Sequence, residues 1–160
     1  MYTGKIKHIH IYELWGVKDI ETSFDPNVNI FIGTNGTNKT IFLNLLEAAL
    51  TVDVNTLCGI EFSRIIIDID AEIPFIEIVQ ISDEEKTIVQ YKLDNVTYDL
   101  ANIPVRMRRY ARSDDSSYLT VINKLHKIVN ISWLQSIAVM LICNLSIPEK
   151  SLSDLRIWWI

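Results

Sequence analysis

One stretch of the sequence has residue types and spacing suited to holding phosphate groups. Residues 31–50 read "FIGTNGTNKTIFLNLLEAAL". The order Gly, four residues, Gly-Lys and Ser or Thr, between a strand and a helix, makes a loop whose backbone N–H groups hold phosphate oxygens. Only Asn38 departs from this order, since a glycine is expected there. We predict a phosphate-binding loop made of Gly33, Thr34, Asn35, Gly36, Thr37, Asn38, Lys39 and Thr40.

The last two loop residues have the chemistry needed for a nucleoside triphosphate. Lys39 is expected to reach the β- and γ-phosphates, and the Thr40 hydroxyl is expected to ligate Mg²⁺. The predicted cofactors are therefore ATP and Mg²⁺, with Thr40 as the metal-ligating residue. The alternative is a strand–loop–helix corner whose lysine is merely solvated.

Asn38 is expected to weaken this site without abolishing it. Glycine would let the backbone approach a phosphate closely, whereas asparagine adds a Cβ atom and an amide group. Asparagine nevertheless tolerates a left-handed backbone better than most residues. We therefore predict weak binding of Mg·ATP, and tighter binding after Asn38→Gly.

The elements that must position this loop can be predicted from periodicity. Residues 5–14 alternate as a half-buried strand, and residues 15–24 contain a turn and a second strand. The turn signal Asp-Pro-Asn precedes a short apolar strand, Val28–Ile32. The helix after the loop has an apolar stripe formed by Ile41, Phe42, Leu45, Leu46 and Leu50.

Beyond this helix the sequence changes in character twice. From Glu61 to Leu100, β-branched runs are separated by turn signals, which predicts antiparallel hairpins or meanders. After Pro104 the pattern becomes helical, with one predicted stripe. That stripe consists of Leu119, Ile122, Leu125 and Val129.

The last segment fits this organisation less well. The apolar run within residues 135–145 is about ten residues long, and a bilayer-spanning helix needs about twenty. The chain then ends in "RIWWI", which would expose large apolar side chains. We expect residues 1–134 to be a partial domain built around the phosphate-binding loop, and residues 135–160 to be an atypical tail of a truncated chain that does not pack as a finished terminus.

Composition and the remaining candidate residues limit other functions. Net charge is −5, which does not favour a dedicated nucleic-acid surface. The basic cluster Arg106, Arg108, Arg109 and Arg112 could meet phosphates, or could be a solvated face balanced by the acidic residues after it. No signal peptide is recognisable near the N-terminus, and we expect a cytoplasmic protein without membrane contact.

Two other pairs of residues could bind a metal or form a disulfide. His8 and His10 share one strand face, but no further ligands stand near them in the sequence, so we expect surface histidines. Cys58 and Cys143 lack metal-site spacing, so we expect free buried thiols in a reducing compartment.

The first fifty residues resemble the N-terminal segment of ABC-type ATPase heads of the SMC, RecF and OLD kind. The resemblance is specific for residues 6–50 and loose up to about residue 134. It includes Gly16, Lys18 and Asp19 in a turn, and Gly33, Asn35, Gly36, Lys39 and Thr40 in the loop. Asn35-Gly36 is its most diagnostic pair, since generic phosphate loops do not require it. The fold that it implies is α/β, the N-terminal half of a P-loop NTPase of the ABC-head kind, with a mixed sheet beside an antiparallel β subdomain.

The resemblance also implies a function. The intact protein would bind ATP and Mg²⁺ and act on DNA, in repair or in defence against foreign DNA, as a homodimer or with a partner subunit. The alternative is a non-catalytic interaction module that has lost nucleotide binding. A small-molecule kinase is disfavoured by the β-rich segment 61–100, because such folds usually alternate helix and strand.

Several parts of the family's machinery have no counterpart in this sequence. The turn has Glu13, Leu14 and Trp15 where the family often has Asn, Phe and a basic residue that contacts nucleotide. The Walker B acidic pair, the signature motif and the switch histidine of the family are not found. "RIIIDID" imitates a Walker B strand, but we expect Asp68 and Asp70 on the outer face of an alternating strand. The chain alone is therefore predicted to be catalytically inactive.

Overall fold

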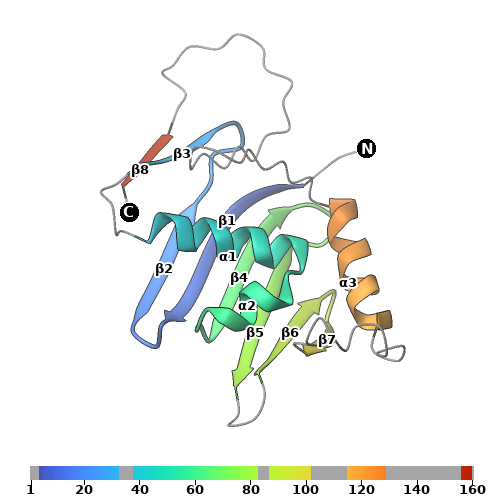
Figure 1. The fold of residues 1–160 in the computed structure, drawn as a ribbon. Helices are drawn as coiled ribbons and strands as arrows, with labels where there is room; N and C mark the ends of the chain where they lie inside the picture. Colours follow the sequence, from blue (N-terminus) through green and yellow to red (C-terminus); the bar gives the residue numbers. More distant parts are fainter. Residues whose placement is uncertain (1–3, 33–37, 83–86, 102–114, 129–155, 160) are drawn as a thin grey trace.

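The protein's computed structural model describes residues 4–32, 38–82, 87–101, 115–128 and 156–159. Its main feature is a six-stranded antiparallel sheet with the strand order β2-β1-β4-β5-β6-β7 (Figure 1). The strands are β1 (Lys5–Leu14), β2 (Lys18–Ser23), β4 (Arg64–Asp70), β5 (Phe75–Ser82), β6 (Thr87–Leu93) and β7 (Val96–Ala101). The predicted β region and its antiparallel hairpins are confirmed.

Alternation of apolar and polar residues sets the two faces of this sheet. In β4, Ile65, Ile67 and Ile69 are buried, whereas Asp68 and Asp70 point to the opposite face. β5 follows the same rule, with Ile76 and Ile78 buried, whereas β1 has an irregularity between Ile6 and His8, after which Ile9 and Ile11 are buried. The inner face is therefore almost entirely apolar, and the outer face is mixed.

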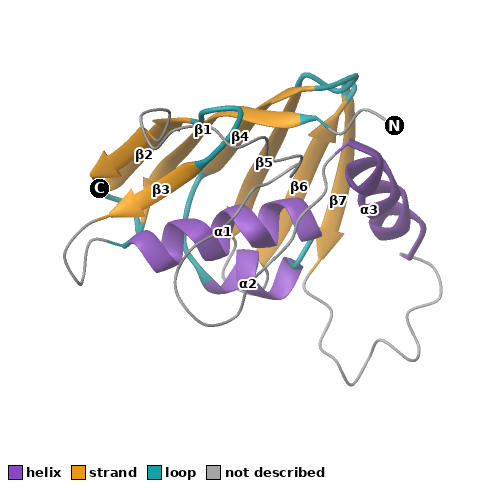
Figure 2. Ribbon diagram, turned by 90° about the horizontal axis from the view of Figure 1, so that it is seen from above, coloured by secondary structure: helices purple, strands orange, loops and turns teal. Residues whose placement is uncertain are grey.

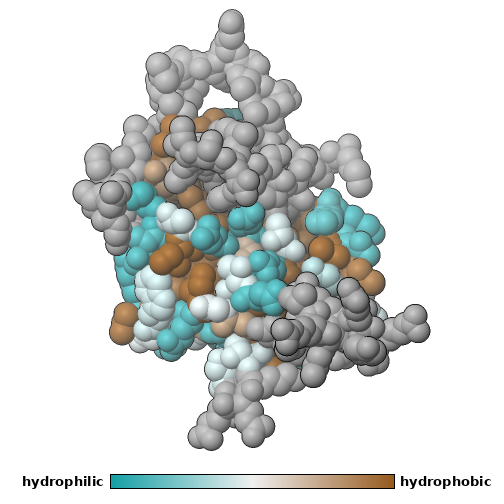
Figure 3. Space-filling model, viewed as in Figure 1, coloured by the Kyte–Doolittle hydropathy of each residue, from teal (hydrophilic) through white to brown (hydrophobic). Residues whose placement is uncertain are grey.

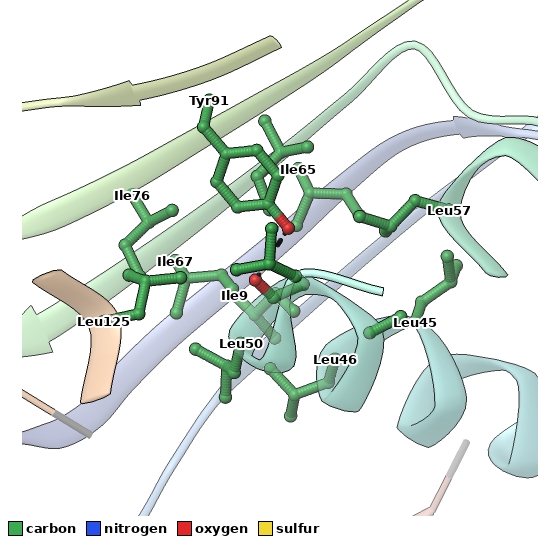
Figure 4. Close-up of a cluster of buried hydrophobic side chains, with 14 of the residues drawn as sticks. Ile9, Leu45, Leu46, Leu50, Leu57, Ile65, Ile67, Ile76, Tyr91 and Leu125 are labelled. Carbon is green, nitrogen blue, oxygen red and sulfur yellow. Dashed lines mark hydrogen bonds between the residues drawn. The ribbon is translucent and has the colours of Figure 1, made fainter. Parts of the chain in front are cut away.

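Two helices cover the inner face (Figure 2). They are α1 (Lys39–Thr51) and α2 (Val54–Gly59). Figure 4 shows the resulting core, in which Leu45, Leu46 and Leu50 of α1 face isoleucines of the sheet. Seen from the same side as Figure 1, the described surface mixes hydrophilic and hydrophobic residues (Figure 3).

The end of α1 and the start of α2 are closely linked. Val52 adopts a left-handed conformation with φ 59°, which ends α1. Asp53 then caps α2, because its carboxylate accepts hydrogen bonds from the backbone N–H groups of Asn55 and Thr56. The sequence interpretation missed α2, since six residues are too few to show helical periodicity.

Helix α3 (Asp115–Ile128) packs beside β7 at one edge of the sheet (Figures 1 and 2). The predicted helix is confirmed, but its predicted stripe is partly wrong. Leu119 is 53% exposed, whereas Val121, Leu125 and Ile128 are buried. Ile122 is partly buried against the core, so the buried face is centred on Val121, Leu125 and Ile128, and Val129 lies outside the described residues.

A second, parallel pair of strands lies next to the N-terminal end of α1. It consists of β3 (Asn29–Ile32) and β8 (Arg156–Trp159), with Ile30 opposite Ile157. β8 thus pairs with the strand that leads into the predicted loop. Residues 135–155 and 160 lie outside the described residues, so the domain boundary near residue 134 stays a prediction.

Candidate nucleotide-binding site

The predicted phosphate-binding loop lies between a strand and a helix, as the sequence pattern requires. β3 ends at Ile32, and α1 begins at Lys39. Residues 33–37 lie outside the described residues, so Gly33, Thr34, Asn35, Gly36 and Thr37 stay predicted. The structure places the other three predicted residues at the start of α1. They are Asn38, Lys39 and Thr40.

Asn38 adopts a left-handed backbone, with φ 63° and ψ 12°. This conformation is one that glycine adopts freely and that asparagine tolerates better than most side chains. The Asn38 carbonyl accepts the first intrahelical hydrogen bond, from the N–H of Phe42 at 2.9 Å. Asn38 therefore adopts the left-handed backbone that asparagine was expected to tolerate at this position.

The first turn of α1 can attract an anion. Backbone N–H groups in the first turn of a helix lack intrahelical acceptors, and the helix dipole adds partial positive charge there. The Asn38 side chain makes no capping hydrogen bond, and the first turn contains no acidic residue. Lys39 is half-buried, and Thr40 is exposed. These donors and the hydroxyl group fit a phosphate group and a hard cation such as Mg²⁺.

Aromatic side chains join the strand and the helix on either side of the loop. The ring of Phe31 in β3 lies 5.4 Å from that of Phe42 in α1, measured between centroids. Phe24, which follows β2, meets Phe31 edge-on at 6.0 Å. Such aromatic pairs add to the stabilisation from burial alone. The two ends of the loop are therefore held by one packed cluster.

The turn between β1 and β2 contains the other residues of the family resemblance. Glu13, Trp15 and Gly16 all have positive φ angles. The Asp19 carboxylate accepts a hydrogen bond from the Glu13 backbone N–H at 2.8 Å. Lys18 is exposed. The position of Asp19 is thus explained by the shape of this turn, without reference to a ligand.

Asp68 and Asp70 lie on the outer face of the sheet, as expected, and α1 lies on the opposite face. Asp68 lies near His8, and the Asp70 carboxylate contacts Lys7 at 3.0 Å. A carboxylate that assists ATP hydrolysis must lie close to the phosphates. The resemblance of residues 64–70 to a Walker B strand is therefore explained by the alternation of buried and outward-facing residues in β4.

Strand pairing brings carboxylates to His8 that the sequence did not reveal. Its Nε2 atom lies 3.0 Å from Glu21 in β2, and its Nδ1 atom lies 3.6 Å from Asp68 in β4. The two carboxylates therefore flank opposite ring nitrogens, so they do not converge on one metal position. His10 stacks on Tyr12 at 3.7 Å between ring centroids. Within the described residues, no group of three His, Cys, Asp or Glu side chains could hold a metal ion.

The thiol of Cys58 is free and half-buried. Burial raises the pKa of the Cys58 thiol, which disfavours the thiolate form. Cys143 and the cluster from Arg106 to Arg112 lie outside the described residues. Of the described helices, none is long and apolar enough to cross a membrane.

Comparison with models of known protein families gives one match to this chain. A family model described as "AAA domain" matches residues 5–154, which is most of the sequence. The chain belongs to this family. The AAA domain match supports a nucleotide-binding function of the ATPase type, and the antiparallel sheet with its helices fits an α/β fold of the P-loop kind. No curated protein matches the chain.

Proposed function

We propose that the chain binds ATP with Mg²⁺ through residues 33–40, as the nucleotide-binding N-terminal part of an ABC-type ATPase head. The observation that carries this proposal is the left-handed Asn38 at the start of α1, directly after the loop that follows β3. A left-handed backbone is open to glycine, so Asn38 keeps a conformation that the usual glycine at this position could also adopt. Membership of the AAA domain family supports the same assignment.

Two residues of this site have distinct roles. Lys39 would place its ammonium group against the outer phosphates, and Thr40 would ligate Mg²⁺. The bound Mg²⁺ ion would neutralise phosphate charge. The backbone N–H groups at the start of α1 would hold the remaining phosphate oxygens.

The proposal extends to the biological process. An intact head of this kind would act in DNA repair or in defence against foreign DNA, with a second copy or a partner subunit. This extension rests on the resemblance of residues 6–50, above all on Asn35-Gly36. An interaction module without nucleotide binding is the competing proposal. Asn38 favours it, because its Cβ and amide would crowd a bound phosphate.

Calorimetric titration with Mg·ATP separates the two proposals. We expect weak but saturable binding to the unaltered protein. Lys39→Ala should weaken it about 10- to 100-fold, because it removes a charge-assisted contact of about 1.5–3 kcal/mol. Lys127→Ala, at an exposed position in α3, is the matched control and should bind as before. Absence of binding at millimolar nucleotide, or equal binding by both variants, would favour the interaction module.

A further inference from the structure

The start of β3 contains a buried polar residue whose hydrogen bonds stay within one short turn. Asn29 is only 8% exposed, although asparagine is usually found at the surface. Its Oδ1 atom accepts a hydrogen bond from the Asp25 N–H at 2.7 Å, and its Nδ2 atom donates to the Asp25 carbonyl at 2.8 Å. One side-chain amide thus satisfies both backbone groups of one residue.

This arrangement needs a side chain with a donor and an acceptor in one plane. An amide has both, whereas a carboxylate has only acceptors and an aliphatic side chain has neither. The Asp25 carboxylate adds a third hydrogen bond, from the Asn27 N–H at 2.9 Å. The turn from Asp25 to Asn29 is therefore closed by three hydrogen bonds, and it fixes where β3 begins.

The position of β3 also determines where the predicted loop begins. β3 has only four residues, so its first residue is close to the start of the loop. Phe31 connects β3 to Phe42 of α1, and so to the other end of the loop. A change at Asn29 would be transmitted through β3 to the distance and angle between the two loop ends.

We infer that Asn29 is a positioning residue for nucleotide binding, acting through β3 on the loop at residues 33–40. This inference rests on the proposed function. Without its amide, the turn has other conformations, and the arrangement of loop ends that accepts phosphate is populated less. Apparent affinity falls in proportion to the fraction of binding-competent protein.

The test compares two side-chain amides that make similar hydrogen bonds in different places, the buried Asn29 and the half-buried Gln80. Asn29→Ala removes the two hydrogen bonds between the Asn29 amide and the Asp25 backbone, in the turn before β3. Gln80→Ala removes three hydrogen bonds between β5 and the α2 region, to the Phe62 N–H and to the carbonyls of Leu57 and Ile60. Both variants should lower the melting temperature. Binding of a fluorescent Mg·ATP analogue is then measured well below both melting temperatures.

We expect Asn29→Ala to weaken nucleotide binding about tenfold, corresponding to a competent fraction of about one tenth. Gln80→Ala should change it less than about twofold, because its contacts lie away from β3. If Asn29→Ala does not fold, Asn29→Asp replaces it, since the acid keeps the acceptor for the Asp25 N–H and loses the donor. Weaker binding of that variant supports the inference equally.

The outcomes separate this inference from the proposed function. Binding by the Asn29 variant at the affinity of the unaltered protein overturns the inference alone, provided that Lys39→Ala still weakens binding. An equal loss in Gln80→Ala also overturns it, since general destabilisation would then explain both. Absence of nucleotide binding by the unaltered protein overturns both.

Discussion

Asn38 illustrates how one residue can keep a backbone conformation while changing the surface that a ligand meets. Its φ of 63° is in the left-handed region, and it starts α1 without a side-chain cap. This backbone conformation is one that glycine at the same position could also adopt. The added Cβ and amide are what distinguish this loop from one with glycine.

The first prediction concerns this difference. Asn38→Gly should tighten Mg·ATP binding about two- to tenfold, the equivalent of about 0.4–1.4 kcal/mol, because it removes side-chain atoms and keeps the backbone angle. Asn95→Gly is a matched control, since Asn95 also has φ 63° but lies in the turn between β6 and β7. Calorimetry checks both variants. Equal or weaker binding by Asn38→Gly would show that the asparagine side chain does not hinder the ligand.

A second prediction concerns Tyr91, whose hydroxyl donates a hydrogen bond to the Ala49 carbonyl near the end of α1. Tyr91 is completely buried, and burial raises its pKa well above the usual value. In the unfolded chain this phenol would lose its proton near pH 10, whereas in the folded protein it stays neutral. Above about pH 10 the unfolded state therefore binds fewer protons, and the free energy of unfolding should fall as the pH rises.

Tyr91→Phe should remove this fall in the free energy of unfolding above pH 10. At neutral pH it should lower the free energy of unfolding by about 1 kcal/mol, because the Ala49 carbonyl loses the hydrogen bond from the Tyr91 hydroxyl. Urea unfolding between pH 8 and 11 measures both effects. Tyr12→Phe, at a half-buried position in β1, is the control, and its free energy of unfolding should still fall above pH 10. An alkaline slope that is the same in Tyr91→Phe and in the unaltered protein would contradict the prediction.

At the level of elements, the end of α3 is hydrogen-bonded to Gly4, at a position with no space for a side chain. The Gly4 N–H donates a hydrogen bond to the Ile128 carbonyl at 2.6 Å. A Cβ atom on Gly4 would lie 2.6 Å from the Ala71 Cβ and 2.7 Å from the Ile69 Cγ2. The start of β1, the end of β4 and the end of α3 thus meet at one glycine.

Gly4→Ala should therefore lower the free energy of unfolding by about 1–3 kcal/mol, as expected for overpacking. Gly59→Ala is the control, because no atom lies within 4 Å of the Cβ position there. That variant should be neutral or slightly stabilising. Chemical denaturation checks the pair. A Gly4→Ala protein as stable as Gly59→Ala would mean that this junction adjusts easily.

Elements with a clear local pattern could be predicted from the sequence. Alternation identified the strand at residues 5–14, and the apolar residues after Lys39 identified α1. Features that depend on tertiary contacts were missed. Periodicity alone placed Leu119 in the core, although Leu119 is exposed and Val121 is buried instead. The carboxylates beside His8 come from two other strands, so no sequence spacing indicated them.

For the whole molecule, the described arrangement separates the candidate loop from the acidic residues that resembled a catalytic strand. Phosphoryl transfer needs a positioned water, a polarising carboxylate and charge stabilisation. Asp68 lies on the opposite face of the sheet from α1, at 48% side-chain exposure. The chain alone is therefore expected to show no ATPase activity above the background of Lys39→Ala. Measurable hydrolysis that Asp68→Asn abolishes would contradict this expectation.

Amide hydrogen exchange, followed by mass spectrometry with and without Mg·ATP, tests most directly where the nucleotide binds. Peptides covering residues 33–42 should exchange more slowly when Mg·ATP is present, because loop and helix N–H groups then bond to phosphate oxygens. Peptides covering β4 and β5, residues 64–82, should exchange as before. Unchanged exchange at residues 33–42 under saturating nucleotide, or protection confined to residues 64–82, would contradict nucleotide binding at this loop.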